Sequence, residues 1–139
     1  MEHLDLPVKE LIKAAMEAKK KAYTPYSGYQ VGAALLTNEL RIYTGCNIEN
    51  ASYGATICAE RVAIDTAIAS GYTKGDFSRL YVMCDSEKVS SCCFICRQVI
   101  GEFFSTDSEV TLYSNDGDKE VYTVKELCPY PFGSEDLKN

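Results

Sequence analysis

The order of apolar segments in the second half of the chain restricts the fold most strongly. RLYVMC, residues 79–84, is a short and largely apolar run, which is typical of a strand buried on both faces. A helix is expected at 94–104, followed by a strand VTLYS at 110–114. A strand–helix–strand unit of this length places its two strands parallel, through a right-handed connection. The sheet must therefore contain a parallel pair.

Two further helices are expected before this unit. Over residues 8–22, apolar residues recur at helical spacing with lysines between them, which predicts an amphipathic helix. CAERVAIDTAIAS, residues 58–70, predicts a second helix, and Gly71 follows where a helix ends. These helices would cover the faces of the sheet.

The remaining strands form hairpins. VGAALL, residues 31–36, and the segment 41–45 are predicted to pair across a turn at 37–39. Asp116-Gly117 predicts a second tight turn, before a last strand at 120–124. The expected fold is α/β, a three-layer α/β/α sandwich with a five-stranded mixed sheet.

Composition limits the class of protein. With 139 residues, 46% apolar and 24% charged, the chain fits one globular domain spanning residues 1–139. No apolar run approaches the roughly 20 residues that span a bilayer, and MEHLDLPVKE lacks the apolar core of a signal peptide, so a cytoplasmic protein is expected. A formal charge of −6 disfavours nucleic acid as a partner. Seven cysteines in such a protein favour thiols or metal over disulfides.

The cysteines fall at the expected helix starts. Cys58 opens one helix, and Cys93 and Cys96 of VSSCCFICRQV open another. A helix N-terminus stabilises a thiolate, and residues three apart share a helical face, whereas Cys92 would point elsewhere. If the two N-termini meet, three thiolates surround one position, and three protein ligands plus a water is the arrangement of catalytic zinc.

Charged residues adjoin these cysteines. Glu60 could take the proton of a metal-bound water and pass it on. Zinc with three thiolates has a net charge of about −1, which Arg61 and Arg97 could offset through N–H···S contacts. Because the single histidine, His3, lies in the N-terminal segment, the chain cannot build Ser-His-Asp or Cys-His catalytic sites.

Other interpretations of these residues stay open. A closed structural zinc site could take Cys46, Cys84 or Cys92 as a fourth ligand. Cys-x-x-Cys could also be a redox pair, or the thiols could be inert. Glu60 could then be an ordinary carboxylate at a helix N-terminus.

The motif Cys-x-Glu followed by a distant Cys-x-x-Cys resembles the zinc-dependent nucleobase deaminases. YSGYQVGAALL, GCNIENASYGATICAER, CCFICRQVI and CPYPFGSEDL look like successive blocks of the cytidine deaminases that act on free nucleosides. The resemblance runs from about residue 26 to 137. It implies one Zn²⁺ per subunit held by Cys58, Cys93 and Cys96, with Glu60 as proton shuttle.

The resemblance also implies an activity and an assembly. The activity is hydrolytic deamination of cytidine and deoxycytidine in pyrimidine salvage, and the assembly is a homotetramer whose pockets are completed by neighbouring subunits. Asn47 and Glu49 would hold the ribose hydroxyls. Other implied contacts to the base or across the interface are those of Tyr29, Ala51, Tyr53, Ala59 and Phe132. Taken from the residues alone, Asn47 and Glu49 could instead bond their own loop, and Tyr53 and Phe132 could pack in the core.

The chain departs from the usual family pattern at two places. Cys92-Cys93-Phe94 stands where Pro-Cys-Gly is usual, and Tyr29-Gln30 stands where Phe-Pro is common. These changes bear on pocket shape and substrate range. The rival functions are deamination of another free cytosine nucleoside, such as a nucleoside antibiotic, a non-catalytic zinc-stabilised module and, disfavoured by the acidic charge, polynucleotide editing.

Overall fold

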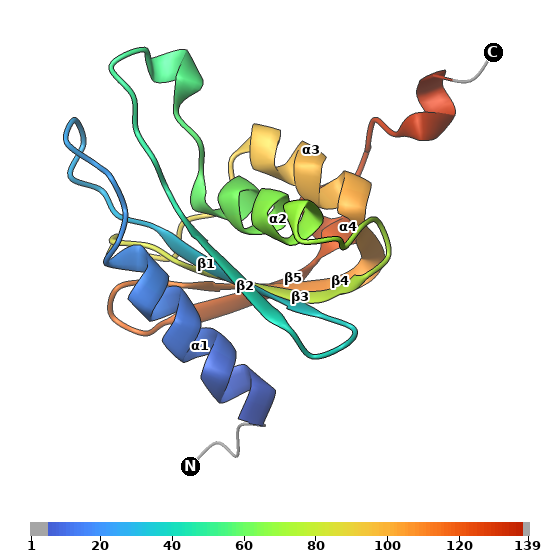
Figure 1. Ribbon diagram of the computed structural model, residues 1–139, viewed down its shortest axis with the longest axis horizontal. Helices are drawn as coiled ribbons and strands as arrows, with labels where there is room; N and C mark the ends of the chain where they lie inside the picture. Colours follow the sequence, from blue (N-terminus) through green and yellow to red (C-terminus); the bar gives the residue numbers. More distant parts are fainter. Residues whose placement is uncertain (1–5, 138–139) are drawn as a thin grey trace.

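A five-stranded sheet forms the middle layer of the protein, in the order β2-β1-β3-β4-β5 (Figure 1). The computed structural model describes residues 6–137, so the prediction about His3 lies outside the described part. The strands are β1 (Gly32–Thr37), β2 (Ile42–Cys46), β3 (Phe77–Met83), β4 (Phe104–Tyr113) and β5 (Lys119–Thr123).

The pairing of the strands confirms the mixed sheet. β3 and β4 run parallel, with Leu80 opposite Val110, as the predicted strand–helix–strand unit requires. β1 pairs antiparallel with both β2 and β3, and β5 pairs antiparallel with β4. The two expected hairpins are therefore present at the two edges of the sheet.

Helices cover both faces of this sheet. α1 (Leu6–Lys19) lies on one face, and α2 (Ala59–Ala69), α3 (Phe94–Phe103) and the short α4 (Val124–Leu127) lie on the other (Figure 1). The predicted three-layer α/β/α sandwich is thus confirmed. No helix in the described part of the chain has the length and apolar character needed to span a membrane.

Three details differ from the predicted elements. α1 ends at Lys19 rather than at residue 22, and the chain turns so that Tyr23 bridges to Ile48. β4 begins at Phe104, directly after α3, and is longer than predicted. α4 was not predicted, although Thr123 and Glu126 form a capping box there, and a Thr-x-x-Glu motif is a known sequence sign of a helix start.

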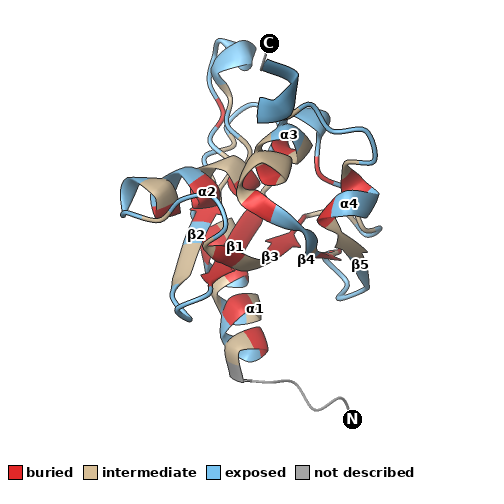
Figure 2. Ribbon diagram, turned by 90° about the vertical axis from the view of Figure 1, so that its right-hand side faces the viewer, coloured by how far each residue is buried: buried red, intermediate tan, exposed pale blue. Residues whose placement is uncertain are grey.

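The core lies on both sides of β1, whose six residues are all buried (Figure 2). Successive side chains of a strand point to opposite faces, so Ala33 and Leu35 pack among the residues under α2 and α3. Ala34 and Leu36 pack towards α1, against Leu11. β1 is therefore apolar without alternation because both of its faces are covered.

Two glycines allow helices to lie directly on the strands. A β-carbon at Gly32 would collide with the Ala15 carbonyl oxygen of α1 and lie 2.5 Å from the Lys19 nitrogen. A β-carbon at Gly45 would collide with the backbone of α2, 2.5 Å from the Ala59 carbonyl oxygen. Gly45 therefore fixes how closely the first turn of α2 approaches β2.

Replacing Gly45 should separate α2 from the sheet. Gly45→Ala is expected to lower the free energy of unfolding by about 1–3 kcal/mol, because the methyl group meets backbone that cannot move aside cheaply. Urea unfolding followed by circular dichroism measures this. A β-carbon at Gly54 meets no atom within 4 Å, so Gly54→Ala should stay within about 0.5 kcal/mol of wild type. Equal stability of the two variants would contradict the close contact.

Candidate metal centre and active site

The N-termini of α2 and α3 meet above the sheet. Cys58 is the N-cap residue of α2 and Cys93 is the N-cap residue of α3, both with extended backbone angles. Each helix end presents unpaired N–H groups and the positive end of the helix dipole, which stabilise an anionic sulfur. Both helix starts thus favour thiolates at the same place.

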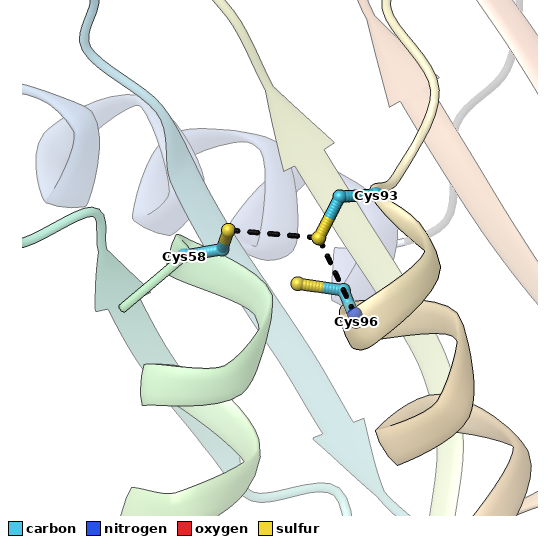
Figure 3. Close-up of side chains that lie close together, drawn as sticks. All are labelled: Cys58, Cys93 and Cys96. Carbon is cyan, nitrogen blue, oxygen red and sulfur yellow. Dashed lines mark hydrogen bonds between the residues drawn. The ribbon is translucent and has the colours of Figure 1, made fainter. Parts of the chain in front are cut away.

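The three predicted ligand sulfurs converge at this point (Figure 3). The Sγ atoms of Cys58, Cys93 and Cys96 all lie within 4.8 Å of one another, and those of Cys58 and Cys93 are 3.8 Å apart. Zinc–sulfur bonds of about 2.3 Å in a tetrahedron place the sulfurs about 3.8 Å apart. The spacing of the sulfurs therefore fits a zinc ion.

Among the described residues, no fourth His, Cys, Asp or Glu joins this group of ligand atoms. Cys92, the neighbour of Cys93, is buried in the apolar core under α2 and α3. Burial, followed by the nearby Glu60 carboxylate, raises the pKa of its thiol. Cys92 is thus a protonated core residue here, and the three-sulfur group leaves one tetrahedral position open for a water or substrate.

Charge within the cluster is unevenly shared. The pKa of Cys58 falls to about 5, because its sulfur accepts hydrogen bonds from Cys96, Arg61 and Cys93. The pKa of Cys96 is raised, chiefly because its thiol donates to Cys58. Without a metal, the cluster therefore carries a thiolate on Cys58 and keeps a proton on Cys96. A divalent cation would displace such protons on binding.

Glu60 lies beside the sulfurs and is almost completely buried. Its side chain is 5% exposed, and burial, together with the negative charge on Cys58, raises the pKa of its carboxyl. It lines a cavity of about 230 Å³ together with Cys58 and Cys93. A carboxyl whose pKa lies above its ordinary value holds a proton more readily, which suits it to acid–base catalysis.

The two arginines make different contacts. Nη2 of Arg61 donates to Cys58 Sγ at 3.6 Å, and its Nε is buried without a hydrogen-bond partner in the described structure. Arg97 donates from its three guanidinium nitrogens to oxygen atoms, those of Cys92 (O, 2.9 Å), Leu127 (O, 3.2 Å) and Ser91 (Oγ, 2.8 Å). The guanidinium of Arg97 therefore braces the segment before Cys93. A contribution of Arg97 to the charge of the thiolates stays a prediction.

Asn47, which lines the cavity, and Glu49 both hold the backbone that precedes β1. Asn47 Oδ1 accepts from the Val31 N–H at 2.9 Å, and its Nδ2 donates to the Tyr29 carbonyl at 2.8 Å. Glu49 accepts from the hydroxyl of Ser27 and from two backbone N–H groups, and these bonds lower its pKa. Both side chains bond to backbone of their own subunit. The amide and the carboxylate each retain capacity for another hydrogen bond.

The other predicted substrate contacts divide into two groups. Tyr29 and Ala59 line the cavity beside Glu60. Ala51, Tyr53 and Phe132 are exposed, so the core positions considered for Tyr53 and Phe132 are not found within one subunit. Phe132 lies along a separate groove of about 290 Å³ beside α3, where its carbonyl accepts from Gln98.

Sequence reasoning missed several cavity residues. Thr56, Ser90 and Ser91 contribute polar groups, and Val31, Val82 and Cys84 supply the apolar wall. Thr56 and the serine pair directly flank the cysteine motifs, so their place in the sequence was the available sign. Cys84, considered from the sequence as a possible fourth zinc ligand, is buried and lines the cavity but does not join the three sulfurs.

Comparisons with known proteins agree with this site. Residues 7–112 match the family model described as cytidine and deoxycytidylate deaminase zinc-binding region. The chain belongs to the cytidine deaminase family. It is 45% identical over 132 residues to the cytidine deaminase of Sporosarcina psychrophila, covering 95% of this chain and 96% of the relative. The cytidine deaminase of Halalkalibacterium halodurans is 43% identical over 129 residues, 93% of this chain and 96% of the relative.

Solved structures of the family share the fold. The crystal structure of the cytidine deaminase from Burkholderia pseudomallei superimposes with a TM-score of 0.87 at 42% identity, covering 95% of this chain and all of that one. The cytidine deaminase from Mycobacterium tuberculosis gives a TM-score of 0.78 at 32% identity, with 93% and 99% covered. The arrangement of layers described above is therefore that of the cytidine deaminase family.

The low pKa of Cys58 can be measured after a chelator removes any metal. Because a thiolate is the reactive form, alkylation of Cys58 by iodoacetamide should stay fast as the pH falls from 8 to about 6 and halve near pH 5. Arg61→Gln removes the N–H···S contact, so the midpoint should rise. Peptide mass spectrometry follows each cysteine separately.

Cys128 is the internal control for this titration. Burial raises the pKa of its thiol, so it should react slowly throughout the same pH range. A midpoint for Cys58 near the ordinary value of about 8.5 would show that the helix ends and Arg61 do not stabilise its thiolate.

Proposed function

We propose that the protein catalyses the hydrolytic deamination of cytidine and deoxycytidine to uridine or deoxyuridine and ammonia. The observation that carries the proposal is the pairing of three converging cysteine sulfurs with a buried carboxyl, Glu60, on one cavity. Similarity to proteins named cytidine deaminase over almost the whole chain supports the same activity. The product nucleosides would enter pyrimidine salvage.

The metal in this proposal is zinc, one ion per subunit. Cys58, Cys93 and Cys96 would hold it, since their number, chemistry and spacing suit a tetrahedral ion with one open position. When bound, zinc would polarise a water molecule and make it a stronger nucleophile. Arg61 offsets part of the negative charge of the thiolates, and Arg97 is proposed to add to this from the adjacent loop.

Glu60 moves the protons in the proposed reaction. Deamination adds the oxygen of water to C4 of the cytosine ring and breaks the bond from C4 to the amino nitrogen. Glu60 takes a proton from the water, delivers it to N3 of the ring, and helps the amine leave as ammonia. Its burial keeps bulk water away from the carboxyl, and its raised pKa lets it both accept and donate.

Other residues would hold the substrate. The ring of Tyr29 and the backbone at Ala59 are proposed to flank the base, because both line the cavity. Asn47 and Glu49 are proposed to bind the ribose hydroxyls with the hydrogen-bonding capacity that their loop contacts leave.

We further propose a homotetramer in the cytoplasm. Ala51, Tyr53 and Phe132 are exposed on a single subunit, and in the proposed assembly they reach across interfaces to complete neighbouring pockets. Size-exclusion chromatography with light scattering tests the assembly independently of the activity.

The rival functions predict different results. A deaminase specialised for another free cytosine nucleoside, such as a nucleoside antibiotic, would convert that compound faster than cytidine when the two compete. A non-catalytic zinc module would bind the metal and convert neither. The family membership favours the cytidine reaction over both.

Removing the proton shuttle should stop the reaction without loss of metal. Glu60→Gln is expected to lower kcat for cytidine at least about 100-fold, because it removes a general acid–base group. The fall in ultraviolet absorbance on conversion to uridine measures the rate, and elemental analysis measures zinc. Asp65→Asn, the same change on the exposed side of α2, is the matched control and should keep wild-type activity. Equal activity of the Glu60 variant and wild type would refute the assigned role.

A further inference from the structure

Three hydroxyl groups link the two loops that border the cavity. The hydroxyl of Tyr29, in the loop before β1, hydrogen-bonds with that of Ser86 and, at 3.2 Å, with that of Ser90. Ser86 and Ser90 are also bonded to each other, at 3.1 Å. These three residues, here called the hydroxyl cluster, form a closed ring of hydrogen bonds. The two serines belong to the segment 84–92, which leads from β3 to Cys93.

The start of the segment 84–92 has further anchors. Asp85 accepts from the Gln30 N–H at 2.7 Å and forms an ion pair with Lys19 of α1 at 2.5 Å. The Asn115 N–H, in the turn between β4 and β5, donates to the Ser86 carbonyl at 2.8 Å. Three separate elements therefore fix this end of the segment on the body of the protein.

The other end is held from α3. Arg97 donates to the Cys92 carbonyl and to the Ser91 hydroxyl, immediately before Cys93. Between these two anchored ends, the hydroxyl of Ser90 bonds to that of Tyr29, and both residues line the cavity. The segment contains no proline. Proline restricts a loop through its own backbone, so this segment must obtain its rigidity from contacts.

We propose that the hydroxyl cluster is a positioning device for Cys93. By tying Ser86 and Ser90 to Tyr29, it fixes the segment 84–92, so that Sγ of Cys93 stays in reach of Cys58 and Cys96. The same bonds hold the ring of Tyr29 against the cavity. The inference rests on the proposed function, because it takes Cys93 as a metal ligand.

The rate of zinc loss tests the proposal without any substrate. Tyr29→Phe removes one hydroxyl and keeps the ring, and Ser90→Ala removes another. Each change breaks two of the three hydrogen bonds in the ring and leaves the third. Each variant is expected to transfer zinc to a coloured chelator about 3- to 10-fold faster than wild type. Because the bonds form one ring, the double variant should lose zinc no more than about twice as fast as the faster single variant.

Two controls separate positioning from general stability. Tyr72→Phe removes a hydroxyl that bonds to Glu39 at 3.2 Å, beyond the C-terminal end of α2 and away from the cysteines, and should leave zinc loss unchanged. Ser90→Thr keeps the hydroxyl and should restore the wild-type rate. Hydrogen exchange should increase in the segment 84–92 of Tyr29→Phe and stay unchanged in α1.

The proposal is overturned if Tyr29→Phe and Ser90→Ala lose zinc at the wild-type rate, or if Tyr72→Phe accelerates the loss equally. These readouts require only the metal-loaded protein. Failure of the wild type to deaminate cytidine would count against the proposed function and would leave the test of the hydroxyl cluster intact.

Discussion

The convergence of two helix N-termini on one point is the constraint on which the rest of the site depends. α2 and α3 lie on the same face of the sheet, and their first turns bring Cys58, Cys93 and Cys96 together (Figure 3). Gly45 lets α2 rest directly on β2, which sets the height of Cys58 above the sheet. The parallel pair β3–β4 requires the crossover that carries α3 and its cysteines to this face.

The negative charge of the sulfurs then determines the roles of the two charged side chains beside them, Arg61 and Glu60. Three thiolates outweigh the charge of one divalent ion, and the contact from Arg61 to Cys58 reduces the excess. Glu60, buried against the same sulfurs, holds its proton more firmly than an exposed carboxyl. The cluster and the carboxyl are thus coupled, since charge on Cys58 raises the pKa of Glu60 and a bound cation would oppose that effect.

Much of this arrangement could be predicted from the sequence because the metal motifs are also helix caps. Cys58 and Cys93 were expected at helix starts, and both are N-cap residues. The apolar run RLYVMC predicted a strand buried on both faces, and residues 80–83 of β3 are buried with side chains in the clusters on both sides of the sheet. The end of α1 could not be predicted, because Lys20 and Lys21 continue the helical pattern in the sequence. The helix nevertheless ends at Lys19, since the chain turns there and Tyr23 forms a bridge to Ile48.

Contacts between distant loops account for what the sequence could not show. The bonds of Glu49 to the backbone at residues 26 and 27 join segments that are separate in the sequence, and no local pattern marks them. The same holds for the bonds of Tyr29 to Ser86 and Ser90. In the chain these serines look like ordinary loop residues, and only the folded structure brings their hydroxyls together with that of Tyr29.

The most direct test of the account is the zinc content of four cysteine-to-serine variants, at positions 58, 92, 93 and 96. The account predicts one zinc per chain in wild type and in Cys92→Ser, and loss of zinc in each of the other three, with circular dichroism confirming that all are folded. Cys92 is the matched control because it adjoins Cys93 in the chain yet packs in the core. Loss of zinc from Cys92→Ser with retention in Cys93→Ser would contradict the assignment of the metal centre.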